Sequence, residues 1–111
     1  MTHRALIHLN EAAPEKVRAV LQNTTNLLAA LGPGTRVEIV AHGPGIAVAT
    51  EPPTEQLTAL LEAGASLCVC RNTLTARGLS EADLHPQAEV VPSGVAHLVL
   101  RQAEGWAYLR P

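Results

Sequence analysis

Residues 37–45 read VEIVAHGPG, a short run of β-branched and apolar residues that ends in a glycine–proline turn. Residues 37–41 are therefore predicted to form a strand, and the Gly43-Pro44-Gly45 segment to end it sharply. Apart from Glu38 the run is apolar throughout and does not alternate with polar residues. Strands of this kind are covered on both faces, which is typical of parallel sheets flanked by helices.

Similar units lie on both sides of this stretch. Further short strands are predicted at residues 5–9, 65–69, 89–91 and 106–109. Apolar residues at helical spacing predict helices at residues 15–31, between Pro53 and Gly64, and on the segment carrying Val95, Leu98 and Val99. A short helix that Asn72 or Thr73 caps is predicted to run through Ala76, and residues 80–83 are expected to add one helical turn. Strands that alternate with helices predict an α/β protein: a three-layer α/β/α sandwich with a five-stranded, mainly parallel sheet, Rossmann-like or flavodoxin-like.

The composition fits one domain over residues 1–111. Hydrophobic residues make up 47% and charged residues 16%, enough for a packed core without disulfides or metal. A net charge of −2 offers no basic face for nucleic acid, and no run approaches the roughly 20 apolar residues that cross a bilayer. The N-terminal apolar run is too short for a signal peptide, so a cytoplasmic location is expected. There Cys68 and Cys70 are not expected to form a disulfide.

Polar side chains follow each predicted strand at its carboxyl end, where parallel sheets bind ligands. They are His8, Asn10, His42, Cys70, Arg71, Asn72, Thr73, Ser93 and Arg110, and Gly43 is expected to add a backbone N–H at the same edge. The sequence has no Gly-x-Gly-x-x-Gly and no Gly-Lys-Ser/Thr loop, which argues against dinucleotide and P-loop sites. It also has no Cys-x-x-Cys and no Gly-x-Ser-x-Gly. Since strand ends meet solvent and are often polar, this gathering is also what an unspecialised edge would show.

Cys70 has the strongest chemical case among these residues. It lies where a strand passes into a helix, so free backbone N–H groups and the positive helix end favour its thiolate. Arg71 is expected to add positive potential. The alternative is that Cys70 is a small buried hydrophobic residue, which is the interpretation preferred for Cys68 inside the apolar run.

The histidines divide into two groups. His42 lies in a tight turn that could direct its imidazole toward Cys70, as a proton donor or a stabilising cation; the alternative is a hydrogen-bonded turn residue. His8 either joins the same edge or is buried. A zinc site from His8, His42 and Cys70 lacks the spacing of metal motifs, so no metal or other cofactor is assigned. The remaining histidines are expected at the surface or in packing, namely His3, His85 and His97.

Five blocks of sequence follow one another along the chain: residues 8–10 (HLN), 40–45 (VAHGPG), 70–74 (CRNTL), 90–95 (VVPSGV) and 105–111 (GWAYLRP). Together they resemble the DsrE/DsrF-like family over nearly the whole chain. The resemblance implies a five-stranded parallel sheet and a homo-oligomer, commonly a trimer or a hexamer of two trimers. It also implies a link to sulfur relay, because some members carry persulfide sulfur on the cysteine that Cys70 matches. His42 falls in the family's His-Gly-Pro turn.

Two functions are consistent with these residues. The first is a cysteine-based sulfur carrier or sulfurtransferase, in which Cys70 and His42 are catalytic and sulfur donor and acceptor proteins are the partners. The second is a non-catalytic oligomeric protein that binds a small anionic ligand at the same edge. The residues expected to bind substrate or ligand are Asn10, Gly43, Arg71, Asn72, Thr73, Ser93 and Arg110. Whether the protein is an enzyme stays open.

Overall fold

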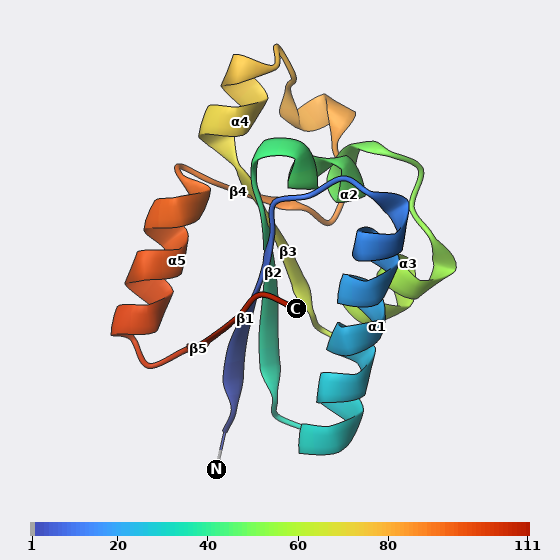
Figure 1. Ribbon diagram of the computed structural model, residues 1–111, viewed down its shortest axis with the longest axis vertical. Helices are drawn as coiled ribbons and strands as arrows, with labels where there is room; N and C mark the ends of the chain where they lie inside the picture. The colour runs from blue at the N-terminus through green and yellow to red at the C-terminus, as the bar shows by residue number, and fades with distance from the viewer. Residues whose placement is uncertain (1) are drawn as a thin grey trace.

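One parallel sheet of five strands organises the computed structural model, which describes residues 2–111. Its strands are β1 (Arg4–Leu9), β2 (Arg36–Ala41), β3 (Ser66–Cys70), β4 (Glu89–Val91) and β5 (Ala107–Leu109). They lie side by side in the order β4-β3-β2-β1-β5, and every neighbouring pair is parallel (Figure 1). The predicted α/β fold is therefore confirmed.

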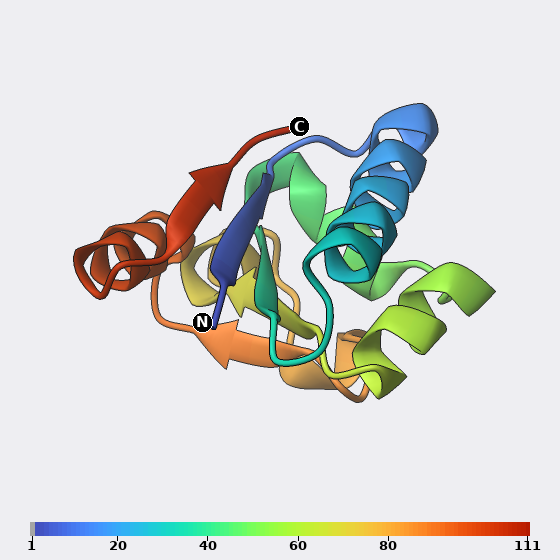
Figure 2. The same cartoon turned by 90° about the horizontal axis from the view of Figure 1, so that it is seen from below.

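Helices cover both faces of the sheet. They are α1 (Pro14–Leu31), α2 (Ala47–Thr50), α3 (Glu55–Glu62), α4 (Arg71–Ala76) and α5 (Gly94–Ala103), with 3₁₀ turns η1 (Gly43–Ile46) and η2 (Glu81–Asp83). Helices α1 and α3 lie on one face and α5 on the other (Figure 2). The strand order advances from β1 to β4 and then returns to β5 beside β1, so a right-handed crossover carries α5 to the opposite face.

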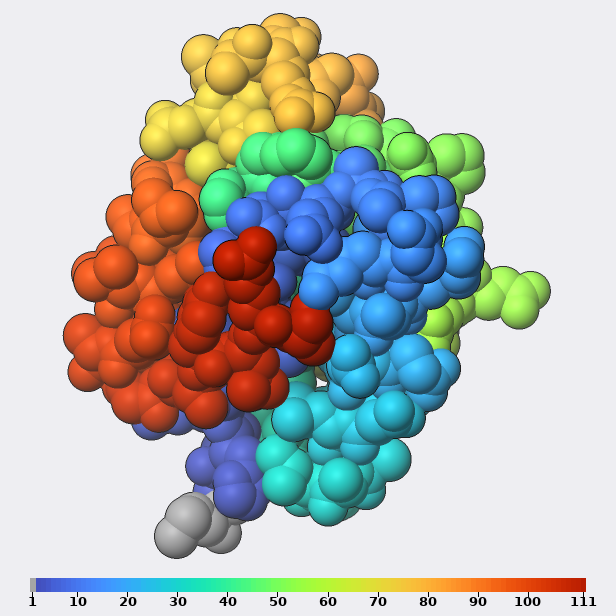
Figure 3. Space-filling view, viewed as in Figure 1, coloured from blue at the N-terminus to red at the C-terminus, as the bar shows by residue number. Residues whose placement is uncertain are grey.

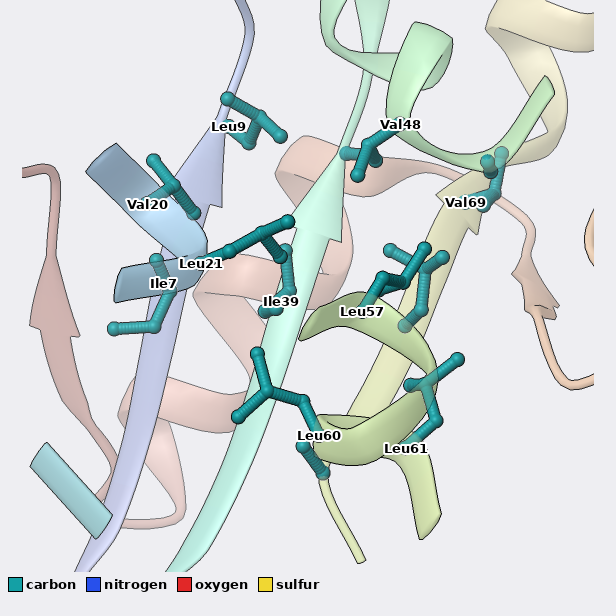
Figure 4. Close-up of a cluster of buried hydrophobic side chains, with 14 of the residues drawn as sticks. Ile7, Leu9, Val20, Leu21, Ile39, Val48, Leu57, Leu60, Leu61 and Val69 are labelled. Carbon is teal, nitrogen blue, oxygen red and sulfur yellow. The ribbon is translucent and has the colours of Figure 1, made fainter. Parts of the chain in front are cut away.

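The larger core lies between the sheet and the two helices α1 and α3. Figure 4 shows Leu21 and Leu57 reaching from these helices toward Ile39 on β2, and all three side chains are buried. Burying a leucine or isoleucine side chain of this kind stabilises the fold by about 2 kcal/mol. This face is therefore the main source of stability.

A smaller core lies between the sheet and α5. It consists of Leu6, Val40, Cys68, Leu98 and Trp106. Cys68 is 1% exposed, which confirms that it is a core residue. The expected apolar stripe of α5 was wrong at two positions, because Leu98 is buried whereas Val95 and Val99 point outward.

The segment after β2 is more regular than the sharp turn that was predicted. Gly43 has φ of +54°, and the chain then winds through η1 into α2. A Cβ at Gly45 would lie 2.1 Å from the carbonyl oxygen of Leu9, so the backbone of η1 touches the end of β1. Glycine is required at position 45 by this close approach rather than by its φ.

The C-terminal segment lies over the edge of the sheet, next to α5. Figure 3 shows it on the surface between α5 and the blue N-terminal third of the chain, and all three residues of β5 are exposed. Among the helices described in residues 2–111, none is both long enough and apolar enough to cross a membrane.

Candidate functional site

The register of the sheet places His8 and Cys70 on the side of the sheet that α5 covers. His8 pairs with Val40, and Val40 pairs with Cys68 of the α5-side core. Paired residues of parallel strands project to the same face, and side chains alternate along each strand. Cys70, two residues beyond Cys68, therefore projects to the same side, at the carboxyl edge of the sheet.

Cys70 is the last residue of β3 and the N-cap of α4. Its 6% exposure would by itself raise the pKa of the thiol. Stabilisation of the thiolate by the backbone N–H groups of Gly94, Thr73 and Asn72 and by the Thr73 hydroxyl outweighs this burial and lowers the pKa below its ordinary value. Backbone N–H groups at the start of both α4 and α5 thus favour the thiolate of Cys70, although its side chain makes no capping hydrogen bond to α4.

Thr73 connects this sulfur to the turn after β2. The backbone N–H of Gly43 donates to Thr73 Oγ1 over 2.9 Å. With its oxygen engaged as an acceptor, the hydroxyl is free to donate its proton to the Cys70 thiolate. The turn therefore orients the hydroxyl that helps to stabilise the thiolate.

Gly94 lies between the two residues predicted to be catalytic. A Cβ at this position would lie 3.1 Å from the Cβ of His42 and 3.3 Å from the Cβ of Cys70. Both distances are shorter than ordinary contacts, so a side chain here would press against His42 and Cys70. Glycine lets the first N–H of α5 approach the sulfur.

His42 is hydrogen-bonded to a second histidine. Its Nε2 lies 2.6 Å from Nε2 of His8, the two rings stack, and His8 Nδ1 lies 2.6 Å from the Tyr108 hydroxyl. Burial lowers the pKa of His8, with further contributions from His42 and Arg110; burial and then Arg110 lower the pKa of His42. Both imidazoles are therefore neutral near pH 7, which favours a hydrogen-bonding or proton-transfer role for His42 over that of a stabilising cation.

Comparison with known proteins identifies the family. The model of the DsrE/DsrF-like family matches residues 5–111. The chain belongs to the DsrE/DsrF-like family. A solved structure, that of the protein of unknown function MTH1491 from Methanobacterium thermoautotrophicum, superposes with a TM-score of 0.92 and 37% identity over 98% of this chain and 99% of that one. No curated protein matches this chain.

In this DsrE/DsrF-like chain, Arg71 does not contribute as expected. Its guanidinium lies 3.4 Å from the carboxylate of Glu81, and both side chains are largely in solvent. The thiolate of Cys70 is stabilised by neutral donors instead. The cation that acts on the site is Arg110, whose charge contributes to lowering the pKa of both histidines, His8 and His42.

Three other residues predicted to bind a ligand, Asn72, Ser93 and Asn10, make different contacts in the structure. Asn72 supplies a backbone N–H to Cys70. Ser93 caps α5, because its Oγ accepts from the Ala96 N–H over 3.2 Å. Asn10 follows β1 and is half-buried, and its Cα lies beside Gly45.

Sequence reasoning did not assign Tyr108 or Gly94 to the site. Tyr108 reaches His8 because β5 pairs with β1, in the register Leu6 to Tyr108. That pairing depends on the strand order, which no local pattern reveals. Gly94 could have been noticed, since it follows a capping serine directly after a strand.

A second polar cluster lies deeper on the same face. His97, predicted to be a surface or packing residue, has its Nε2 2.7 Å from the Glu38 carboxylate, and Arg101 donates to both Glu38 oxygens over 3.0 Å. Burial, together with the negative charges of Glu38 and Glu89, raises the pKa of Cys68 to about 12.

This cluster is a buried ion pair rather than a metal site. Ligand atoms of Glu38, Cys68 and His97 lie within 4.8 Å of one another, and within residues 2–111 no other such trio converges. The guanidinium of Arg101 already neutralises the carboxylate, and the Cys68 thiol holds its proton. The zinc hypothesis for His8, His42 and Cys70 gains no support from the described residues.

Proposed function

We propose that Cys70 of this DsrE/DsrF-like protein carries sulfane sulfur as a persulfide. The observation that supports this most directly is the set of N–H and O–H donors around the Cys70 sulfur, which favours the nucleophilic thiolate. Cys68 lies two residues away and keeps its proton. One cysteine of the pair is thus suited to nucleophilic attack. Membership of the family adds to this support.

The proposed transfer has two balanced steps. The Cys70 thiolate attacks the outer sulfur of a donor persulfide, R–S–SH; a new S–S bond forms, the donor's S–S bond breaks, and R–S⁻ leaves with the bonding electrons. An acceptor thiolate then attacks the outer sulfur of Cys70–S–SH and regenerates the Cys70 thiolate. No external oxidant or reductant is needed, and low-pKa thiols suit both attack and departure.

The setting of this proposal is the cytoplasm, with protein partners that donate and accept sulfur. Both cysteines are free thiols, and sulfur carried as a persulfide survives where no oxidant converts the thiols to disulfides. The alternative function is the binding of a small anion by the N–H groups at Cys70 together with Arg110. It requires no reaction at the sulfur.

Mass spectrometry separates the two functions. The protein is incubated with a small persulfide donor, freed of it, and weighed with and without reductant. The proposal predicts added sulfur that the reductant removes, that Cys68→Ser retains and that Cys70→Ser loses. If no sulfur is added although Cys70 is accessible to alkylation, the carrier function is overturned. Stabilisation by sulfate or phosphate would then support anion binding.

A further inference from the structure

A hydrogen-bonded chain runs from the protein surface to the Cys70 site. Tyr108 is 40% exposed, and its hydroxyl contacts His8 Nδ1; His8 Nε2 in turn contacts Nε2 of His42. We call these three residues the Tyr108–His8–His42 chain. His42 ends it beside Gly94 and Cys70, and its Nδ1 makes no hydrogen bond to another residue within 2–111.

The contacts restrict how protons can be arranged in this chain. One proton must lie between the two Nε2 atoms, since two would repel and none would leave two lone pairs facing each other. In one arrangement Tyr108 donates to His8, His8 donates to His42, and His42 bears a proton on Nδ1. In the other arrangement every bond is reversed, and Nδ1 of His42 is bare. Shifting one proton along each bond converts the first arrangement into the second.

The charges around the chain favour neutral rings in both arrangements. The ionisable groups that face it are Arg110 from the end of β5 and Cys70 from β3, while α5 contributes the uncharged Gly94. Arg110 opposes a second positive charge on either imidazole. The chain can therefore pass a proton along without storing one.

We propose that the Tyr108–His8–His42 chain conducts a proton from solvent to the thiolate that leaves when the Cys70 sulfur attacks an S–S bond. Its purpose rests on the proposed function, because sulfur transfer requires an S–S bond to break at Cys70. His42 Nδ1 gives its proton to R–S⁻, His8 Nε2–H passes its proton to His42 Nε2, and Tyr108 passes its own to His8 Nδ1. The tyrosine oxygen then takes a proton from water, so one solvent proton is consumed for each thiol released.

Three reagents whose leaving groups differ in basicity test this proposal at Cys70. Iodoacetamide releases iodide, which needs no proton, and Ellman's reagent releases a weakly basic aromatic thiolate. Bis(2-hydroxyethyl) disulfide releases a basic alkylthiolate, whose departure is helped most by a proton. Rates are read by peptide mass in the parent protein, Tyr108→Phe, His8→Ala, the double variant, and Leu109→Ala. Leu109 is the neighbour of Tyr108 on β5 and faces the other side of the sheet.

The proposal predicts that variants of the Tyr108–His8–His42 chain lose reaction rate with the alkyl disulfide but not with iodoacetamide. In Tyr108→Phe the rate with the alkyl disulfide should fall about tenfold relative to iodoacetamide, since general acid catalysis is worth roughly 100-fold or more in full. The same relative rate should fall as much in His8→Ala, and in the double variant it should fall no further than in either single variant. Leu109→Ala should react at the rates of the parent protein.

Two results would overturn the inference in different ways. Equal slowing with all three reagents, or no slowing in Tyr108→Phe, would show that these residues only shape the site, and would leave the proposed function of Cys70 untouched. A parent protein whose Cys70 reacts with none of the reagents would overturn the proposed function, and the inference with it.

Discussion

Cys68 and Cys70 show how strongly position determines the chemistry of one residue type. They lie on the same strand and project to the same side of the sheet, two residues apart. Burial and neighbouring carboxylates raise the pKa of Cys68 to about 12, whereas donors at two helix ends lower the pKa of Cys70. The last residue of the strand, unlike the strand interior, meets backbone N–H groups that have no partner within a helix.

The Thr73 hydroxyl should contribute measurably to the reactivity of Cys70. Thr73→Val removes one donor to the thiolate, so the pKa of Cys70 should rise and its alkylation by iodoacetamide at pH 7 should slow by about threefold, in line with a single modest hydrogen bond. Thr75→Val, on an exposed position of the same helix, serves as the control and should react like the parent. Equal rates in both variants would show that the backbone donors alone stabilise the thiolate.

The two site histidines should make stability depend on pH below neutrality. Their pKa values are lowered in the folded protein, so the unfolded chain takes up protons first as the pH falls below about 6.5. Stability should therefore fall from pH 6.5 down through the folded-state pKa values and be unaffected above that range. Urea unfolding at pH 7.5 and 5.5 should show a smaller loss in His8→Asn than in the parent. His3→Asn, ahead of β1, should lose as much as the parent.

Part of the site was predictable residue by residue. A cysteine at a strand–helix junction meets helix N–H groups in any parallel α/β fold, so the prediction for Cys70 needed only local pattern. The environment of His42 depended on His8 and Tyr108, which come from strands brought together by the sheet order. The pairing of Arg71 with Glu81 was not predicted, because a long exposed side chain follows a counter-charge that only the fold brings near.

At the scale of elements, α5 is the helix that determines the site, and polar contacts hold it to the sheet. Arg101 and His97 of α5 both reach Glu38 of β2, and the Arg101 guanidinium stacks 5.0 Å from the Trp106 ring centroid. Glu38 is 5% exposed. The cluster thus fixes the height at which the first turn of α5, with Gly94, meets Cys70.

Glu38→Gln should loosen this attachment. The substitution leaves the Arg101 guanidinium beside a buried neutral amide, so the free energy of unfolding should fall by about 2 kcal/mol. This is less than the roughly 3–5 kcal/mol of fully buried pairs, because Arg101 is partly exposed. Urea denaturation measures this. Glu104→Gln breaks an exposed pair with the same arginine and should cost below about 0.5 kcal/mol. Equal losses in both variants would contradict the structural role of Glu38.

Element boundaries followed from local chemistry more closely than the connections did. Helix α1 spans Pro14–Leu31, one residue longer at its start than the predicted 15–31. The short η1 and α2 were not predicted, since four-residue elements carry too few apolar positions to show a period. Helix α4 begins at Arg71 because its N-cap is Cys70, two or three residues before the predicted caps Asn72 and Thr73.

At the scale of the whole molecule, the two faces of the sheet are covered unequally. Helices α1 and α3 share one face, whereas α5 alone covers the other. The outer surface of α5 is apolar: Val95, Val99 and Leu100 are each more than half exposed. Apolar side chains gathered on one side of a small protein favour association with a further copy of the same surface.

The resemblance to the DsrE/DsrF-like family implies a homotrimer or a hexamer, and this apolar surface is consistent with such association. We expect light scattering at micromolar concentration to give the mass of a trimer or a hexamer. Leu100→Glu places a charge on the apolar surface of α5 and should shift the mass toward the monomer, because burying an unpaired carboxylate in an interface is costly. Leu31→Glu makes the same change at an exposed leucine at the end of α1, on the other face, and should leave the mass unchanged. A parent protein with monomer mass would contradict the prediction. An oligomer that both variants leave intact would show that α5 is not its interface.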